Sequence, residues 1–103
     1  MLDIPNLMVK QIGLLLEDQE KYDNYVKNGY KFEFDFKSCK LIVTYKKKEY
    51  IVTLITEDKQ LCWCLTPYNH SSFITNIENG LEIVLFAIKE NEELYSSKKG
   101  KNV

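Results

Sequence analysis

The sequence predicts an α+β domain with the element order α-β-β-β-β-α, in which two helices pack on one face of a four-stranded antiparallel meander sheet. Three observations predict it: an N-terminal segment with helical spacing of apolar residues, one strictly alternating segment, and several β-branched runs joined by short polar turns. The 103 residues have the size of one domain, and we expect residues 1–95 to form it. The polar, Lys-rich residues 96–103 are expected to be a disordered tail.

The first element is predicted to be an amphipathic helix. Apolar side chains recur on one helical face from Met8 to Val26. Asp3 is placed to cap the N-terminus, and Asn28-Gly29 forms a C-terminal stop because Gly adopts the left-handed conformation readily. The acidic run 17–20 permits a bend near the middle of this segment.

Four strands are predicted to follow. From Tyr30 to Lys37 the period changes to two, which predicts a half-buried strand whose aromatic side chains face the core: Tyr30, Phe32, Phe34 and Phe36. The runs 41–45 and 50–55, rich in β-branched and aromatic residues, predict a hairpin. The short run 61–65, with Trp63 facing the core, predicts the fourth strand.

Residues 81–88 fit either a helix or a strand. Asn79-Gly80 is a favoured hairpin dipeptide, which would make the following run a strand. A capping box from Thr75 to Glu78, together with helical spacing of apolar residues from Ile74 to Ile88, favours a helix. We therefore predict a second helix that begins near residue 75 and ends in the acidic segment 90–93.

The charge is unevenly distributed along the chain. The formal net charge is -1, yet residues 37–48 hold five lysines and no acidic residue, whereas the segments 1–36 and 49–95 are acidic. Every basic residue is Lys, so the bidentate recognition of phosphate that Arg provides is excluded. The Lys-only usage and the abundance of Asn, Ile and Tyr indicate an AT-rich genome, such as that of a low-GC bacterium or one of its phages.

The sequence predicts a cytoplasmic protein with no membrane partner. The longest nearly uncharged stretch, Leu81 to Ile88, is far shorter than the roughly 20 apolar residues that span a bilayer. The first residues lack the features of a secretory signal.

One set of residues is a candidate for metal binding, and no motif indicates catalysis. Three Cys and the single His could supply the four ligands of a tetrahedral zinc site; the candidates are Cys39, Cys62, Cys64 and His70. Cys62 and Cys64, however, are two residues apart on a predicted strand, whereas the paired ligands of structural zinc sites lie in tight turns. Packing of the cysteines as small apolar residues behind Trp63 is the favoured interpretation. We find no nucleophile elbow, phosphate loop or paired carboxylates, so we expect no cofactor and no enzymatic activity.

A Lys-rich hairpin is the candidate binding site. Its lysines combine positive charge with neighbouring tyrosines that are able to stack on bases; the residues are Lys37, Lys40, Tyr45, Lys46, Lys47, Lys48 and Tyr50. The same pattern also suits a solvated turn whose lysines discourage aggregation at a sheet edge.

These observations favour a non-catalytic binding protein, an accessory or inhibitor encoded by a phage or mobile element, that occludes a surface of another protein. The first alternative is a small nucleic-acid-binding module that uses the hairpin from Lys37 to Lys48. The second alternative is a Cys/His zinc-binding domain, and a homodimer is left open because an open sheet has two edges.

Overall fold

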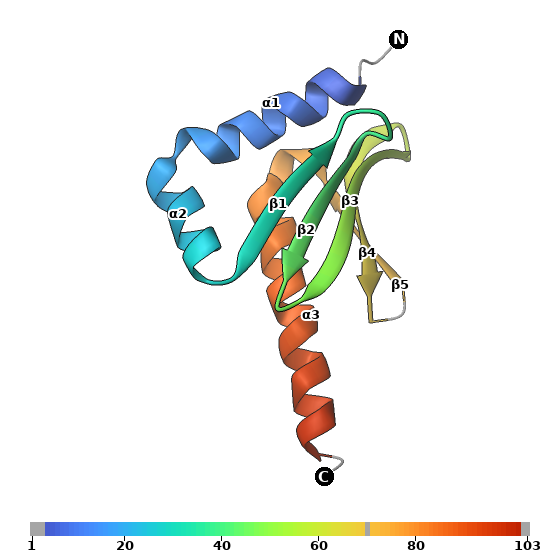
Figure 1. Cartoon of the computed structure of the whole chain (residues 1–103). Helices are drawn as coiled ribbons and strands as arrows, with labels where there is room; N and C mark the ends of the chain where they lie inside the picture. Colours follow the sequence, from blue (N-terminus) through green and yellow to red (C-terminus); the bar gives the residue numbers. More distant parts are fainter. Residues whose placement is uncertain (1–3, 70, 102–103) are drawn as a thin grey trace.

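The computed structural model describes residues 4–69 and 71–101, with side chains described as far as Leu94. The elements are α1 (Ile4–Glu17), α2 (Gln19–Lys27), β1 (Tyr30–Asp35), β2 (Lys40–Tyr45), β3 (Lys48–Glu57), β4 (Gln60–Tyr68), β5 (Ser71–Asn76), the 3-10 helix η1 (Ile77–Asn79) and α3 (Leu81–Lys101). Figure 1 shows one curved sheet, with the helices gathered on its concave side. The predicted α+β class is therefore confirmed.

The N-terminal segment, predicted as one helix, forms the two helices α1 and α2, which are divided at Asp18, so the prediction of two helices in all is corrected to three α-helices within the described residues. Asp18 has an extended backbone (φ -91°, ψ 90°), and its side chain accepts a hydrogen bond from the Lys21 backbone N–H, as an N-cap does. The predicted C-terminal stop is confirmed, because α2 ends at Lys27 and Gly29 has a φ of +101°. The predicted cap Asp3 lies outside the described residues.

The sheet is an antiparallel meander of five strands in the order β1-β2-β3-β4-β5, so the prediction of four strands is corrected. The missed strand is β5, which pairs with β4 over Cys62↔Asn76 to Tyr68↔Ser71. Its two serines weaken the strand signal, and Ile74 also fits the helical spacing of the residues that follow. Backbone pairing to β4 decides the outcome, as tertiary context commonly does for a short edge strand.

The predicted second helix exists but begins later than expected. Asn76 caps the short 3-10 helix by accepting a hydrogen bond from the Glu78 N–H over 2.8 Å, and Gly80 then takes a φ of +81°. An α-helix does not continue through that conformation, so α3 starts at Leu81. Residues 81–88 are thus helical and not a strand, and the helical backbone runs on through residues 96–101, for which we expected a tail.

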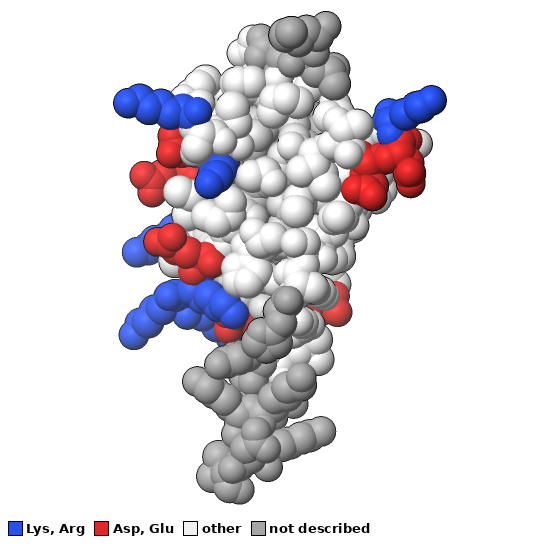
Figure 2. All heavy atoms as spheres, turned by 90° about the vertical axis from the view of Figure 1, so that its right-hand side faces the viewer, with Lys and Arg blue, Asp and Glu red and all other residues white. Residues whose placement is uncertain are grey.

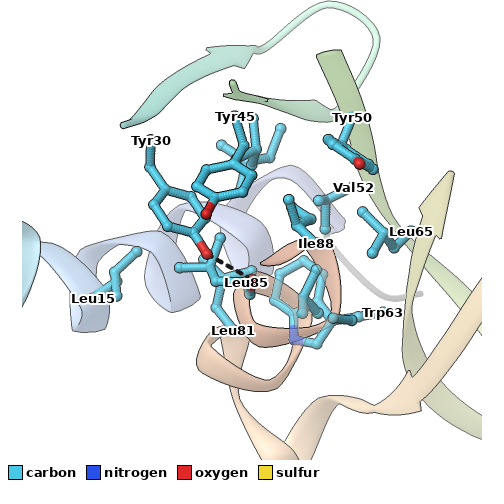
Figure 3. Packing of buried hydrophobic residues seen from close by; sticks show 14 of the residues in the cluster. Leu15, Tyr30, Tyr45, Tyr50, Val52, Trp63, Leu65, Leu81, Leu85 and Ile88 are labelled. Atoms are coloured by element: carbon cyan, nitrogen blue, oxygen red, sulfur yellow. Dashed lines mark hydrogen bonds between the residues drawn. The ribbon is translucent and has the colours of Figure 1, made fainter. Parts of the chain in front are cut away.

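The core lies between the concave sheet face and the helices α1 and α3 (Figure 3). Trp63, Tyr50 and Met8 are its largest fully buried side chains. The Tyr30 hydroxyl donates a 2.9 Å hydrogen bond to the Leu85 carbonyl and so joins β1 to α3. Three of the four aromatic residues predicted to face the core from β1 pack there.

The prediction that the fourth aromatic residue, Phe36, faces the core is wrong. Phe36 lies beyond the end of β1 and is 62% exposed. Asp35 Oδ1 accepts hydrogen bonds from the backbone N–H groups of Lys37 and Ser38. This turn ends the strand one residue before Phe36.

Candidate functional site

The convex face of the sheet carries an apolar surface without helical cover. Residues paired directly across the strands point to the same face, so the registers Ile42↔Ile51, Ile51↔Thr66 and Thr53↔Cys64 place these side chains opposite the core. The same alternation continues into β5, where Cys64 pairs with Ile74. We call this set the outer face: Ile42, Thr44, Ile51, Thr53, Ile55, Cys62, Cys64, Thr66 and Ile74.

The outer face is bordered by charged residues, among them Glu49, which pairs with Thr44 across β2 and β3 and so points to the same side of the sheet. Figure 2 views the molecule from the side on which β3 to β5 lie in Figure 1, and its middle is an uncharged area with Lys, Asp and Glu at both sides. Strand β1 forms one border, because Lys31, Glu33 and Asp35 occupy its outward positions. Most outer-face side chains are half-buried by their neighbours, whereas Ile74 is 45% exposed.

The predicted Lys-rich site is divided by the fold. Lys37 and Lys40 lie at one end of β2, and Lys46 and Lys47 form the two-residue turn at its other end. The six residues of β2 separate the two groups by roughly 17 Å, at about 3.4 Å per residue. The lysines of residues 37–48 therefore do not form one continuous basic patch.

The two tyrosines proposed to stack on bases are core residues. Tyr45 is 4% exposed and Tyr50 is fully buried. Lys46 Nζ lies 5.5 Å from the ring centroid of Tyr45, and Lys48 Nζ lies 5.5 Å from that of Tyr50, so the neighbouring rings interact with lysines of the chain itself. Neither tyrosine presents an open ring face to a nucleic acid.

The zinc candidates occupy separate parts of the fold. Cys62 and Cys64 point outward from β4, whereas Cys39 lies in the loop between β1 and β2 and has its Sγ 3.8 Å from the Phe36 carbonyl oxygen. His70 lies outside the described residues. Within the part of the chain that is described, no three His, Cys, Asp or Glu side chains gather closely enough to hold a metal ion.

A buried polar network connects β3, α3 and the turn after β4. The Tyr50 hydroxyl donates to Glu92 Oε1 over 2.8 Å and accepts from Asn91 Nδ2 over 2.9 Å. Asn91 Oδ1 in turn accepts from the Asn69 backbone N–H over 2.8 Å. Burial raises the pKa of Tyr50 to about 12, the Asn91 hydrogen bond opposes this shift, and the Glu92 hydrogen bond adds to it.

This network was not anticipated from the sequence. Asn91 and Glu92 lie in a segment that reads as a solvated acidic end, yet they are 2% and 7% exposed. Because the Tyr50 hydroxyl and the Asn91 amide bond to groups on different elements, the network fastens α3 to the sheet and to the turn after β4.

The outer face was also missed, although the sequence carries a signal for it. Strands covered on one face alternate between apolar and polar residues, as β1 does, whereas strands covered on both faces read as continuous apolar runs. The segments 41–45, 50–55 and 61–65 are nearly continuous in this way. That pattern indicates cover on both sides of β2 to β4.

Comparisons with known proteins give no relative: no family model, no curated protein and no solved structure matches the chain. Among residues 4–69 and 71–101, the helices lack the combination of length and apolar character needed to cross a membrane.

Proposed function

We propose that this chain is a non-catalytic protein-binding protein that docks its outer face on a different protein. One observation carries the proposal. The runs in β2 to β4 have the composition of strands covered on both faces, and no described element of the chain covers the convex side. A partner that supplies the missing layer resolves this mismatch.

The chemistry of the face defines the chemistry of the partner. Ile42, Ile51 and Ile74 offer stiff apolar side chains, and the threonines among them add small polar contacts. The partner surface is therefore apolar at its centre. Charged groups belong at its margin, where β1 presents Lys31, Glu33 and Asp35 to steer the approach.

The size of the face favours a different protein over a second copy. Strands β2 to β5 span roughly 19 Å at about 4.8 Å per strand, and their apolar rows extend about 17 Å. A footprint of this size is a few hundred Å², below the ~800 Å² per partner of a standard stable interface. Reversible binding to another protein fits it better than a permanent homodimer.

An accessory or inhibitory role follows from this mode of binding, since a sheet face laid on a partner blocks the surface that it covers. We propose that such a protein, encoded by a phage or mobile element, acts by occlusion. The use of Lys for every basic residue supports the proposed phage or mobile-element origin. It does not bear on the proposed occlusion of a partner surface.

Two exposed isoleucines provide a matched test. Ile74 lies on the outer face and is 45% exposed, while Ile83 lies on α3 and is 41% exposed. Three baits are compared for the proteins that they retain from host lysate: the wild type, Ile74→Glu and Ile83→Glu. The proposal expects a protein that the wild type and Ile83→Glu retain and that Ile74→Glu loses.

The baits are first compared by circular dichroism, so that loss of folding is distinguished from loss of binding. Equal retention of every protein by the two variants contradicts the outer-face interface. Light scattering on the purified chain tests whether the partner is a second copy of this chain. A dimer that dissociates in Ile74→Glu would show that it is, and would contradict binding to a different protein.

A further inference from the structure

A pocket lies on the opposite side of the sheet from the outer face, where three parts of the chain meet. Its walls come from the end of α2, from the neighbouring ends of β1 and β2, and from α3. The volume is about 460 Å³. Small-molecule sites commonly occupy about 300–1,000 Å³, so the pocket has the size for a compact organic ligand.

Aromatic rings form much of the wall. Tyr25 meets Tyr30 edge to face with ring centroids 5.3 Å apart, and Tyr30 lies 4.5 Å from Tyr45. Figure 3 shows Tyr30 and Tyr45 with their hydroxyl groups directed toward α3. Phe86, on the α3 side, is 60% exposed. An exposed phenyl ring beside packed tyrosines offers a planar ligand a surface for stacking.

Lysines outnumber carboxylates among the residues that line the pocket. Lys46 and Lys89 line it from the turn after β2 and from α3. Glu82 also lines it, but Lys21 Nζ lies 2.7 Å from Glu82 Oε1 and offsets that carboxylate. The lining thus carries two lysines and one carboxylate that is itself paired with Lys21, a balance that favours an anion.

The backbone position of Lys46 is unusual for its residue type. Lys46 and Lys47 have φ values of +51° and +70°, as in a type I′ turn, where Asn-Gly is strongly preferred. The left-handed conformation costs an L-residue about 1–2 kcal/mol. From this turn the Lys46 side chain extends over the Tyr45 ring at the pocket wall.

We propose that this pocket binds a small planar aromatic anion, whose ring stacks against Phe86 beside the partly exposed Tyr25 and whose acidic group is held by Lys46 and Lys89. The ligand class is an aromatic ring that bears a carboxylate, a sulfonate or a phosphate. The outer face takes no part in this binding, so the pocket and the protein interface are independent.

The test uses naphthalene-2-carboxylate as the probe and the neutral naphthalene-2-carboxamide as its matched control. Binding to the purified full chain is followed by ligand-observed NMR and by calorimetry. The carboxylate is expected to bind more tightly than the amide. Lys46→Gln and Lys89→Gln are each expected to weaken carboxylate binding about tenfold and to leave amide binding nearly unchanged.

Two control variants locate the site. Lys59→Gln removes a lysine from another tight turn, with a similar φ of +65°, and leaves the pocket intact. Ile74→Glu alters the outer face only. Both are expected to bind the carboxylate as the wild type does.

Three outcomes overturn the proposal. The first is the absence of carboxylate binding to the wild type. The second is equal affinity for the carboxylate and the amide. The third is loss of binding in Lys59→Gln or Ile74→Glu to the same degree as in Lys46→Gln. Each variant changes an exposed side chain, and its thermal midpoint is measured to confirm that it folds.

Discussion

The Tyr50 hydroxyl donates a 2.8 Å hydrogen bond to Glu92 Oε1, so a fully buried ring near the start of β3 is tied to a carboxylate that is 7% exposed on α3. The two residues are 42 positions apart in the chain. Their contact holds the long C-terminal helix against the concave face of the sheet and leaves the outer face without cover from that helix.

Removing the Tyr50 hydroxyl is therefore expected to destabilise the fold. In Tyr50→Phe, Glu92 loses a donor and Asn91 loses an acceptor, and a buried polar group left unpaired costs about 1–3 kcal/mol. Urea unfolding should show a decrease of this size in the free energy of unfolding. Tyr22→Phe is the matched control, because its hydroxyl bonds to none of the described residues, and it should change the free energy little.

Alkaline pH is expected to destabilise the fold at the pH where the buried tyrosines lose their protons, after the exposed tyrosines have ionised. Burial raises the pKa of Tyr50 to about 12, and it raises that of Tyr30 as well, whereas both titrate near the ordinary value in the unfolded chain. The folded state thus keeps protons that the unfolded state releases. Its stability is fully present below about pH 10 and falls as the pH rises from there toward 12.

The measurement for this prediction combines tyrosinate absorbance with circular dichroism across the same pH range. We expect the exposed tyrosines to ionise first, with the last ionisations coinciding with the loss of secondary structure. Complete ionisation of all seven tyrosines in a fully folded protein would contradict the burial of Tyr30 and Tyr50.

The turn between β2 and β3 should accept a more stable sequence. Lys46→Asn combined with Lys47→Gly places the preferred residues at two positions of positive φ and should raise the free energy of unfolding by about 1 kcal/mol. The same exchange at Asp58 and Lys59, whose φ values are +49° and +65°, should act similarly. Only the first exchange removes a pocket lysine, so it alone should also weaken binding of naphthalene-2-carboxylate.

The sequence predicts the local structure best where one pattern operates alone. The alternation from Tyr30 to Phe34 and the Asn28-Gly29 stop correspond to β1 and to the end of α2. The prediction is wrong at Phe36. The Asp35 side chain forms a turn that ends the strand, but the alternation of apolar residues in the sequence continues through Phe36 and so does not reveal that turn.

The remaining differences arise from interactions between segments. Strand β5 is stabilised by pairing with β4, which a composition of two serines and one asparagine does not reveal. The burial of Tyr45 depends on which face of β2 meets the helices, so the sequence marks it equally well as a core residue or as a base-stacking residue. The pocket is beyond prediction for the same reason, since Tyr25, Lys46 and Phe86 meet only after α2 and α3 have docked.

Native cysteines give the most direct test of the outer face as a protein interface. Cys64 lies on that face and Cys39 lies in the loop between β1 and β2, and both are partly exposed. The alkylation rate of each thiol is measured by mass spectrometry for the purified chain in buffer and in host lysate. The account predicts that lysate slows the alkylation of Cys64 severalfold relative to that of Cys39. An unchanged ratio of the two rates, at lysate concentrations that saturate the wild-type bait, would contradict it.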